Sequence, residues 1–353
     1  MKILGIETSC DETAVAIVKN GTKILSNVVA SSLELHQKTG GIIPEIAARE
    51  QVKCIIPVIN ETMKDIDAIA VTYGPGLIGS LLVGIETAKA LTYLWQKPIV
   101  PVNHLLAHIY GCFLQPKLKS QKSKVKSDKT KNSLPKFPAV CLIASGGHTE
   151  LVLMKNHGNF TWLGGTRDDA AGEAFDKIAR LLGLGFPGGP MIERYALKFK
   201  VQGSRFEVNF PRPMISENNL DFSFSGLKTA VLKKIKELKE TKQLNNQTTE
   251  QLAFEVQEAI TDCLVTKTIR ATRKFKAKSI LLAGGVAANQ RLREKMKQHA
   301  TRNTQHAKFF APAKNLSTDN AAPIASYAFF NYRPVPWQKI TPYPSLEIDE
   351  QPF

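Results

Sequence analysis

Apolar and polar positions follow the same order in two stretches of the chain, one in each half. ILGIETSCDETAVAIVKNG, residues 3–21, predicts an apolar strand, a small polar turn and an alternating strand that ends at a hairpin signal. VCLIASGGHTELVLMKNHG, residues 140–158, repeats that order. At a constant offset of 136 residues, Ser9 superposes on Ser145, Thr13 on Thr149, Lys19 on Lys155 and Asn20 on Asn156. The pattern predicts a duplicated protein with one such unit in each of two lobes.

A glycine-rich junction between a buried strand and a helix follows in each half. AIAVTYGPGLIGSLLVGIETAKAL, residues 68–91, and SILLAGGVAANQRLREKM, residues 279–296, both end an apolar strand in glycine and then start a helix. Backbone N–H groups at a helix N-terminus form an anion site when no side chain covers them. Each junction alone is compatible with a simple tight turn. Together with the ETSCDET and ASGGHT turns, the junctions indicate the walls of one nucleotide cleft.

Two histidines four residues apart lie in NHLLAHIYG, residues 103–111, a stretch that otherwise reads as an apolar helix. His104 and His108 share one helical face, so both imidazoles can reach a common ion. The alternative is a pair of core histidines. A third ligand is needed for a metal site, and Asp319 is the best candidate, although an Asp before an alanine-rich helix is often only its N-cap. His148, between glycine and threonine, competes as a ligand but fits a phosphate turn better.

Further carboxylates occupy turns and one predicted helix. Asp11 and Glu12 lie in the first turn, where they either act on a substrate or form a polar hairpin corner. Glu173 and Asp176 lie three residues apart in DDAAGEAFDK and share a helical face, before a Pro-Gly-Gly turn at 187–189. They are candidates to hold ribose hydroxyls, with a solvated helix face as the alternative.

Composition places the chain among ordinary globular proteins with an unusual charge. Its 353 residues are 43% hydrophobic, and 47 Lys and Arg against 31 Asp and Glu give a net charge of +16. Such an excess attracts phosphate backbones, although a soluble basic surface is an equally good interpretation. Residues 115–136 contain eight lysines, one aspartate and almost no apolar side chains, which predicts a flexible basic loop. Leu227–Lys242 predicts a basic helix that is either solvated or in contact with RNA phosphates.

Several classes of protein are excluded. The five cysteines form no CxxC pair, so neither a zinc ribbon nor a disulfide framework is predicted. Leu105 stands where a metallopeptidase HExxH motif needs Glu, and no GxSxG elbow is present. The N-terminus does not read as a signal peptide, and no apolar run approaches a membrane span, so we expect a soluble cytoplasmic protein without a membrane partner.

The motifs in their order closely resemble the TsaD family, also called Gcp or YgjD. The resemblance runs through ILGIETSCDET, GGIIPEIAARE, TYGPGLIGSLLVG, NHLLAH, ASGGHTEL, DDAAGEAFDK, FPGGP, DFSFSGLKTA, AGGVAAN and STDNAA, nearly the whole chain. It departs from the family pattern at Ala144, Arg167, Ser317 and Pro323. None of these four is a candidate ligand for the metal. The lysine-rich loop is also longer than the family's usual linker.

The resemblance implies an α/β protein with the two-lobed, ribonuclease H-like duplicated fold of actin, sugar kinases and Hsp70. It implies transfer of a threonylcarbamoyl group from threonylcarbamoyl-AMP to N6 of adenosine 37 in tRNAs that read ANN codons. A small-molecule phosphotransferase of the same fold and a non-catalytic scaffold are the alternatives. The expected lobes are residues 1–114, with 323–353 packing back on them, and 137–322, which carries a helical insertion.

The resemblance also assigns residues and partners. Metal ligands for Fe²⁺ or Zn²⁺ are expected at His104, His108 and Asp319. An adenine nucleotide, as threonylcarbamoyl-AMP, ATP or AMP, is expected to contact Ile143, Ala144, Ser145, Gly146, Gly147, Asp176, Gly189 and Asn289. Asp11 and Glu12 match an acidic pair with an expected catalytic role. Expected partners are tRNA, a paralogous TsaB-like subunit and a TsaE-like ATPase.

The basic loop supplies a testable prediction. Deleting Lys117 to Lys131 removes seven lysines, and we expect weaker tRNA binding with a flatter dependence of log affinity on log salt concentration, because fewer counterions are released. Filter binding between about 50 and 200 mM salt measures both quantities. An unchanged slope would identify the loop as a linker.

Overall fold

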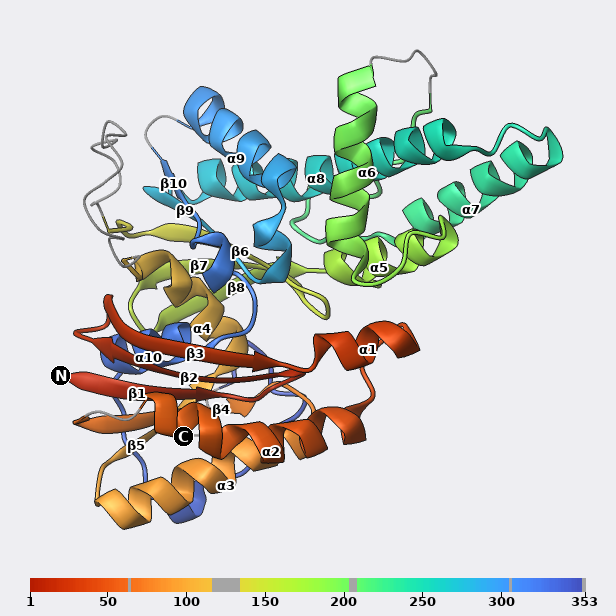
Figure 1. The fold of residues 1–353 in the computed structure, drawn as a ribbon. Coiled ribbons are helices and arrows are strands. Elements are labelled where there is room, and N and C mark those ends of the chain that lie inside the picture. Colours follow the sequence, from red (N-terminus) through yellow and green to blue (C-terminus); the bar gives the residue numbers. More distant parts are fainter. Residues whose placement is uncertain (63–64, 116–133, 203–207, 305–306, 351–353) are drawn as a thin grey trace, which may run out of the picture. The chain divides into compact units, whose positions relative to one another are not determined.

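The computed structural model describes residues 1–62, 65–115, 134–202, 208–304 and 307–350. The chain forms two compact units (Figure 1). Unit 1 comprises residues 1–136, 156–159 and 312–353, and unit 2 comprises residues 137–155 and 160–311. Most of the predicted basic loop, residues 116–133, lies outside the described residues.

Unit 1 is built on a five-stranded sheet in the order β3-β2-β1-β4-β5. Its strands are β1 (Lys2–Glu7), β2 (Glu12–Lys19), β3 (Lys23–Ser31), β4 (Ala68–Gly74) and β5 (Ile99–Asn103). β1, β2 and β3 form an antiparallel meander, while β4 and β5 run parallel to β1. β1, β2, β4 and β5 are mostly buried because helices cover the sheet on both faces, whereas the edge strand β3 is more exposed.

One face of this sheet is covered by α2 (Pro44–Thr62) and α3 (Ile78–Trp95), as Figure 1 shows. Alternate strand residues such as Leu4, Ile6 and Val15 pack with Ile55 and Leu81 of these helices in one core cluster. α1 (Leu33–Thr39) connects β3 to α2. Apolar residues at every second position of the strands and on one face of α2 thus form one shared core.

The opposite face of the sheet holds α10 (Ala321–Phe330), against which α4 (His104–Tyr110) packs. α10 approaches β1 closely because Gly5 has no side chain: a Cβ there would lie 2.4 Å from the carbonyl oxygen of Ala321 and 2.9 Å from the nitrogen of Ala325. Short 3-10 turns complete the unit at η1 (Gly111–Phe113), η4 (Lys314–Leu316) and η5 (Trp337–Lys339).

Unit 2 repeats the topology of unit 1, with a sheet in the order β10-β9-β6-β7-β8. Its strands are β6 (Ala139–Ala144), β7 (Thr149–Asn156), β8 (Asn159–Gly165), β9 (Ser279–Ala283) and β10 (Lys308–Phe310). Ile6 pairs with Val15 across the first hairpin, and Leu142 pairs with Leu151 across the second. Both pairs fit the offset of 136 residues, which confirms the duplication predicted from the sequence.

The helices of unit 2 pack on one face of its sheet and form its main core. They are α5 (Ala171–Leu181), α6 (Gly188–Gln202), α7 (Ser225–Glu240), α8 (Asn246–Lys274) and α9 (Gln290–Asn303), with the 3-10 turn η3 (Gly285–Ala288) before α9. The Pro-Gly-Gly segment expected as a turn starts α6 at Gly188. The basic segment predicted as a helix is α7. Among the described residues, no helix combines the length and apolar character needed to cross a bilayer.

The packing of α10 on β1 can be tested at Gly5. We expect Gly5→Ala to lower the free energy of unfolding by about 1–3 kcal/mol, because the added methyl group forces α10 off the sheet. Urea unfolding followed by circular dichroism measures the change. Gly41→Ala is the matched control, since a Cβ there meets nothing within 4 Å, and its effect should stay within about 0.5 kcal/mol. Equal effects of the two substitutions would contradict the proposed role of the close approach.

Candidate functional site

His104 and His108 lie one helical turn apart on α4, directly after β5. The side-chain oxygen of Asn103 starts this helix by accepting from the backbone N–H groups of Leu105 at 2.9 Å and Leu106 at 3.2 Å. The Nε2 atoms of the two histidines are 3.1 Å apart. Both side chains are largely buried, with 12% and 5% of their surface exposed. The strand-to-helix turn therefore aims two imidazoles at one point.

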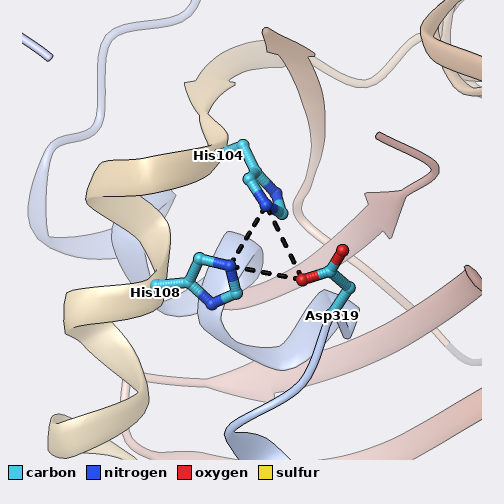
Figure 2. A group of neighbouring side chains, drawn as sticks. All are labelled: His104, His108 and Asp319. Atoms are coloured by element: carbon cyan, nitrogen blue, oxygen red, sulfur yellow. Dashed lines mark hydrogen bonds and ion pairs between the residues drawn. The ribbon is translucent and has the colours of Figure 1, made fainter. Parts of the chain in front are cut away.

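Asp319 brings a carboxylate to the same point from the segment before α10 (Figure 2). Its Oδ1 lies 3.3 Å from Nε2 of His108 and 3.6 Å from Nε2 of His104. The N-cap of α10 is Asn320, whose side chain accepts a hydrogen bond from the backbone N–H of Ala322. Asp319 is therefore not the cap of this helix. All three ligand atoms lie within 4.8 Å of one another.

The spacing of these three atoms fits a metal ion. Nitrogen and oxygen ligands at about 2.1 Å from one ion are roughly 3.0–3.4 Å from each other at octahedral or tetrahedral angles. The observed separations of 3.1, 3.3 and 3.6 Å come close to that range. Two imidazoles and one carboxylate are also a donor set used by Fe²⁺ and Zn²⁺.

A fourth residue, Glu7, contacts His104 at the ring nitrogen that faces away from His108 and Asp319. Its Oε2 lies 3.0 Å from Nδ1 of His104, and only 1% of the residue is exposed. Burial raises the pKa of Glu7, but the charge of His104 and hydrogen bonds from His104 and Thr72 outweigh burial and leave the pKa below its usual value. Burial in turn disfavours a charged His104, yet Glu7 and Asp319 raise its pKa to about 9. A metal ion at Nε2 competes with that proton.

The acidic turn between β1 and β2 is held by its backbone carbonyls. Nε2 of Gln51, on α2, lies 2.9 Å from the carbonyl of Cys10, 3.0 Å from that of Glu12 and 3.3 Å from that of Thr8. The hydroxyl of Ser80 donates to the Cys10 carbonyl at 3.0 Å. These contacts fix the turn that carries the carboxylates of residues 11 and 12.

Asp11 and Glu12 interact with each other within this turn. Burial, the charges of Asp319 and Asp11 and a hydrogen bond with Asp11 raise the pKa of Glu12 to about 10. At neutral pH the Glu12 carboxyl therefore keeps its proton and donates it to Asp11.

In unit 2, the predicted nucleotide-contacting residues of the first turn lie at the end of β6. Ile143 and Ala144 are fully buried strand residues, so they offer backbone atoms only. Ser145 closes the turn, because its backbone N–H donates to the His148 carbonyl at 2.8 Å. A Cβ built on Gly146 or Gly147 meets nothing within 4 Å, so a ligand can approach the backbone there.

Two further turns meet this one inside unit 2. Gly172 at the start of α5 lies so close to Ser145 that a Cβ would be 2.4 Å from the Ser145 carbonyl oxygen, and at Gly284 it would be 2.4 Å from that of Ala144. Asn289 follows η3 and is 7% exposed. Its Oδ1 accepts from Leu292 at 2.9 Å and caps α9, while its Nδ2 donates to Gln257 at 2.9 Å.

The carboxylates expected to hold ribose make structural contacts as well. Asp176 Oδ1 accepts from the backbone N–H of Gly188 at 2.6 Å and so caps α6, and burial raises its pKa. Gly189 stands beside it with open space at its Cβ position. Glu173 forms an ion pair with Lys177 at 2.8 Å, and 44% of its side chain is exposed. Asp176 and Gly189 therefore lie together, whereas Glu173 faces a lysine.

Glu7 and Gln51 are the residues of this site that were not predicted from the sequence. A charged residue directly after the apolar run of residues 3–6 is a signal that points to Glu7, because buried carboxylates need specific partners. No comparable signal marks Gln51, whose hydrogen-bond partners lie about 40 residues away along the chain.

Known structures share the fold of the chain. The activator of 2-hydroxyisocaproyl-CoA dehydratase from Clostridium difficile, solved with bound ADPNP, matches 94% of this chain and 95% of its own length with a TM-score of 0.52 at 14% sequence identity. The repeated topology and this likeness confirm the predicted two-lobed α/β fold of the actin and sugar kinase type.

Sequence relatives are much closer. A tRNA N6-adenosine threonylcarbamoyltransferase from Syntrophomonas wolfei is 45% identical over 98% of this chain and 97% of its own length. One from Thermomicrobium roseum is 47% identical over 94% of this chain and 92% of its own length. The family model for TsaD, tRNA N6-adenosine threonylcarbamoyltransferase, matches residues 23–326. The chain therefore belongs to the TsaD family of transferases, as its motifs predict.

Proposed function

We propose that the chain transfers the threonylcarbamoyl group of threonylcarbamoyl-AMP to N6 of adenosine 37 in tRNAs that read ANN codons. Membership of the TsaD family, at 45% identity over nearly the whole chain, is the observation that carries this proposal. Its substrate is an activated mixed anhydride, so the protein needs to align two reactants rather than form a covalent intermediate.

The cluster of His104, His108 and Asp319 is proposed to hold one Fe²⁺ or Zn²⁺ ion. The donor set and the separations between its ligand atoms support this assignment. When bound, the ion supplies a Lewis acid for a carbonyl or phosphate oxygen of the substrate. The histidines are held for this purpose by α4, and Asp319 by the chain before α10.

The turns of unit 2 are proposed to bind the adenylate. Gly146 and Gly147 leave the backbone of the first turn open to phosphate oxygens, and Gly189 does so at the start of α6. Asp176, whose carboxylate caps α6 beside Gly189, is proposed to accept a hydrogen bond from a ribose hydroxyl. The side chain of Asn289 already makes two hydrogen bonds, so its contact with nucleotide is proposed through its remaining N–H. Ile143, Ala144 and Ser145 shape the turn.

Asp11 is proposed as the base and Glu12 as its neutral neighbour. N6 attacks the carbamoyl carbon, the new N–C bond forms, and the bond from that carbon to the phosphate oxygen breaks with its electron pair. AMP leaves, and Asp11 takes the proton that N6 loses. The raised pKa of Glu12 supports this division, since a carboxylic acid that keeps its proton cannot serve as the base.

A paralogous TsaB-like subunit is the proposed partner of unit 1. α2 and α3 pack together and leave apolar side chains in solvent, among them Val52 with 62% of its surface exposed, Ile56 with 55% and Ile78 with 58%. Such a surface is typical of a protein interface. A TsaE-like ATPase as a second partner and a cytoplasmic location are proposed from family membership alone. The lysines of α7 and of the basic loop are proposed to bind tRNA because of their positive charge.

Reconstitution tests the proposed function. The chain is incubated with its partner subunits, synthetic threonylcarbamoyl-AMP and a tRNA transcript, and the nucleosides are analysed by mass spectrometry. Threonylcarbamoyladenosine that forms only with this chain supports the proposal. ATP-dependent phosphorylation of a small molecule without any modified adenosine would favour a phosphotransferase instead.

Loss of a metal ligand is the first prediction for this site. We expect His108→Ala to lose bound metal and to transfer more than about 100-fold more slowly, which exceeds the typical cost of losing a residue that only supports a ligand. Metal content by mass spectrometry and single-turnover transfer measure the two effects. His299→Ala, on the exposed part of α9, is the control. A folded His108→Ala variant with normal metal content would contradict the assignment.

The acidic pair gives a second prediction. We expect Asp11→Asn to slow transfer by about 100-fold or more, because the base is lost, and Glu12→Gln to stay within about 10-fold of the parent, because an amide resembles a protonated acid. The kcat of each variant with saturating tRNA measures the difference. The reverse order of the two effects would assign the base to Glu12.

A further inference from the structure

Glu7 ends a strand in which the four residues before it, residues 3–6, are apolar. It is 1% exposed, and its neighbours Leu4, Gly5 and Ile6 belong to the packed interior of unit 1. A carboxylate in such a place is unfavourable unless charged or hydrogen-bonded groups surround it, and an apolar residue would pack there at lower cost. Packing of the core therefore does not explain a glutamate at position 7.

Both oxygens of Glu7 are bound. Oε1 accepts from the backbone N–H of Ser9 at 2.6 Å, and Oε2 accepts from the hydroxyl of Thr72 at 2.6 Å. Oε2 also lies 3.0 Å from Nδ1 of His104. Thr72 lies on β4, next to β1 in the sheet, so two neighbouring strands hold the carboxylate in one orientation.

Glu7 Oε2 is the nearer partner of Nδ1 of His104, from which Ser9 Oγ also lies 3.2 Å away, and these contacts leave Nε2 for other partners. With Nδ1–H donating to Glu7, the lone pair of a neutral imidazole is on Nε2, the atom that lies 3.1 Å from Nε2 of His108 and 3.6 Å from Oδ1 of Asp319. Within the part of the chain that the structure describes, Nδ1 of His108 has no such carboxylate partner. The two histidines are therefore supported unequally.

We propose that Glu7 is the positioning residue of the metal centre, which fixes the tautomer and ring orientation of His104 and makes Nε2 the stronger metal donor. The inference rests on the proposed function, because it requires an ion at His104, His108 and Asp319. Carboxylates that accept the second N–H of a ligating histidine act in this way in other metal sites. Thr72 supports Glu7 by holding the oxygen that faces the imidazole.

Metal affinity tests this role without any use of activity. Zn²⁺ binding to the full chain is measured by competition with a chromophoric chelator, and the Co²⁺-loaded protein is compared by its visible absorption spectrum. We expect Glu7→Gln, which keeps the shape and loses the charge, to bind Zn²⁺ about 10–100-fold more weakly. A shifted Co²⁺ spectrum should accompany the weaker binding.

Thr72→Val provides a second variant that keeps the side chain's shape and removes only one hydrogen bond to Glu7. We expect its Zn²⁺ affinity to fall by about 2- to 10-fold, the effect of one such bond. Thr62→Val is the matched control, because Thr62 is a buried threonine whose hydroxyl donates only to the Val58 carbonyl in α2. Its affinity should equal that of the parent.

The outcomes separate the inference from the proposed function. If the parent chain binds Zn²⁺ and both Glu7→Gln and Thr72→Val bind it equally well, Glu7 is not a positioning residue, while the metal site stands. If the parent chain binds no metal although it is folded, the proposed metal centre itself is wrong. If Glu7→Gln does not fold, the affinity of Thr72→Val decides the question.

Discussion

The close approach of α10 to β1 is the contact on which the geometry of unit 1 depends. Gly5 removes the side chain that would separate the helix from the sheet, and small residues on α10, such as Ala321 and Ala325, complete the fit. Asp319 lies two residues before this helix, and α4 with its histidines packs against it. A small displacement of α10 therefore moves Asp319 relative to the two histidines, so a backbone contact determines the spacing of the three proposed ligands.

Negative charge is the second constraint on this unit. Glu7, Asp11, Glu12 and Asp319 lie near one another, and three of them are accommodated in different ways. Glu7 has hydrogen bonds and His104, Glu12 keeps its proton, and Asp319 faces two imidazoles. This arrangement suits a bound cation, because an added positive charge reduces the repulsion among the carboxylates.

Local sequence patterns predicted many of the strands and helices of this protein. Contacts between residues far apart in the sequence could not be predicted in this way. Alternation of apolar residues and the hairpin signals identified the duplicated strands, because these depend on neighbours in the chain. The spacing of His104 and His108 likewise lies within one helical turn. Asp319 was ambiguous between ligand and cap until the structure showed Asn320 as the cap. The contacts of Glu7 with Thr72 and His104 join residues that are 65 and 97 positions apart in the sequence. The periodicity of a local stretch cannot predict such long-range contacts.

The shared register of the two hairpins also bears on how the protein arose. At the offset that aligns the sheets, Glu7 corresponds to Ile143, Asp11 to Gly147 and Glu12 to His148. All three acidic residues of the first copy are therefore replaced by non-acidic residues in the second. Strand pairing uses backbone groups and does not depend on these side chains, so the two copies keep one sheet topology while their turns carry different side chains.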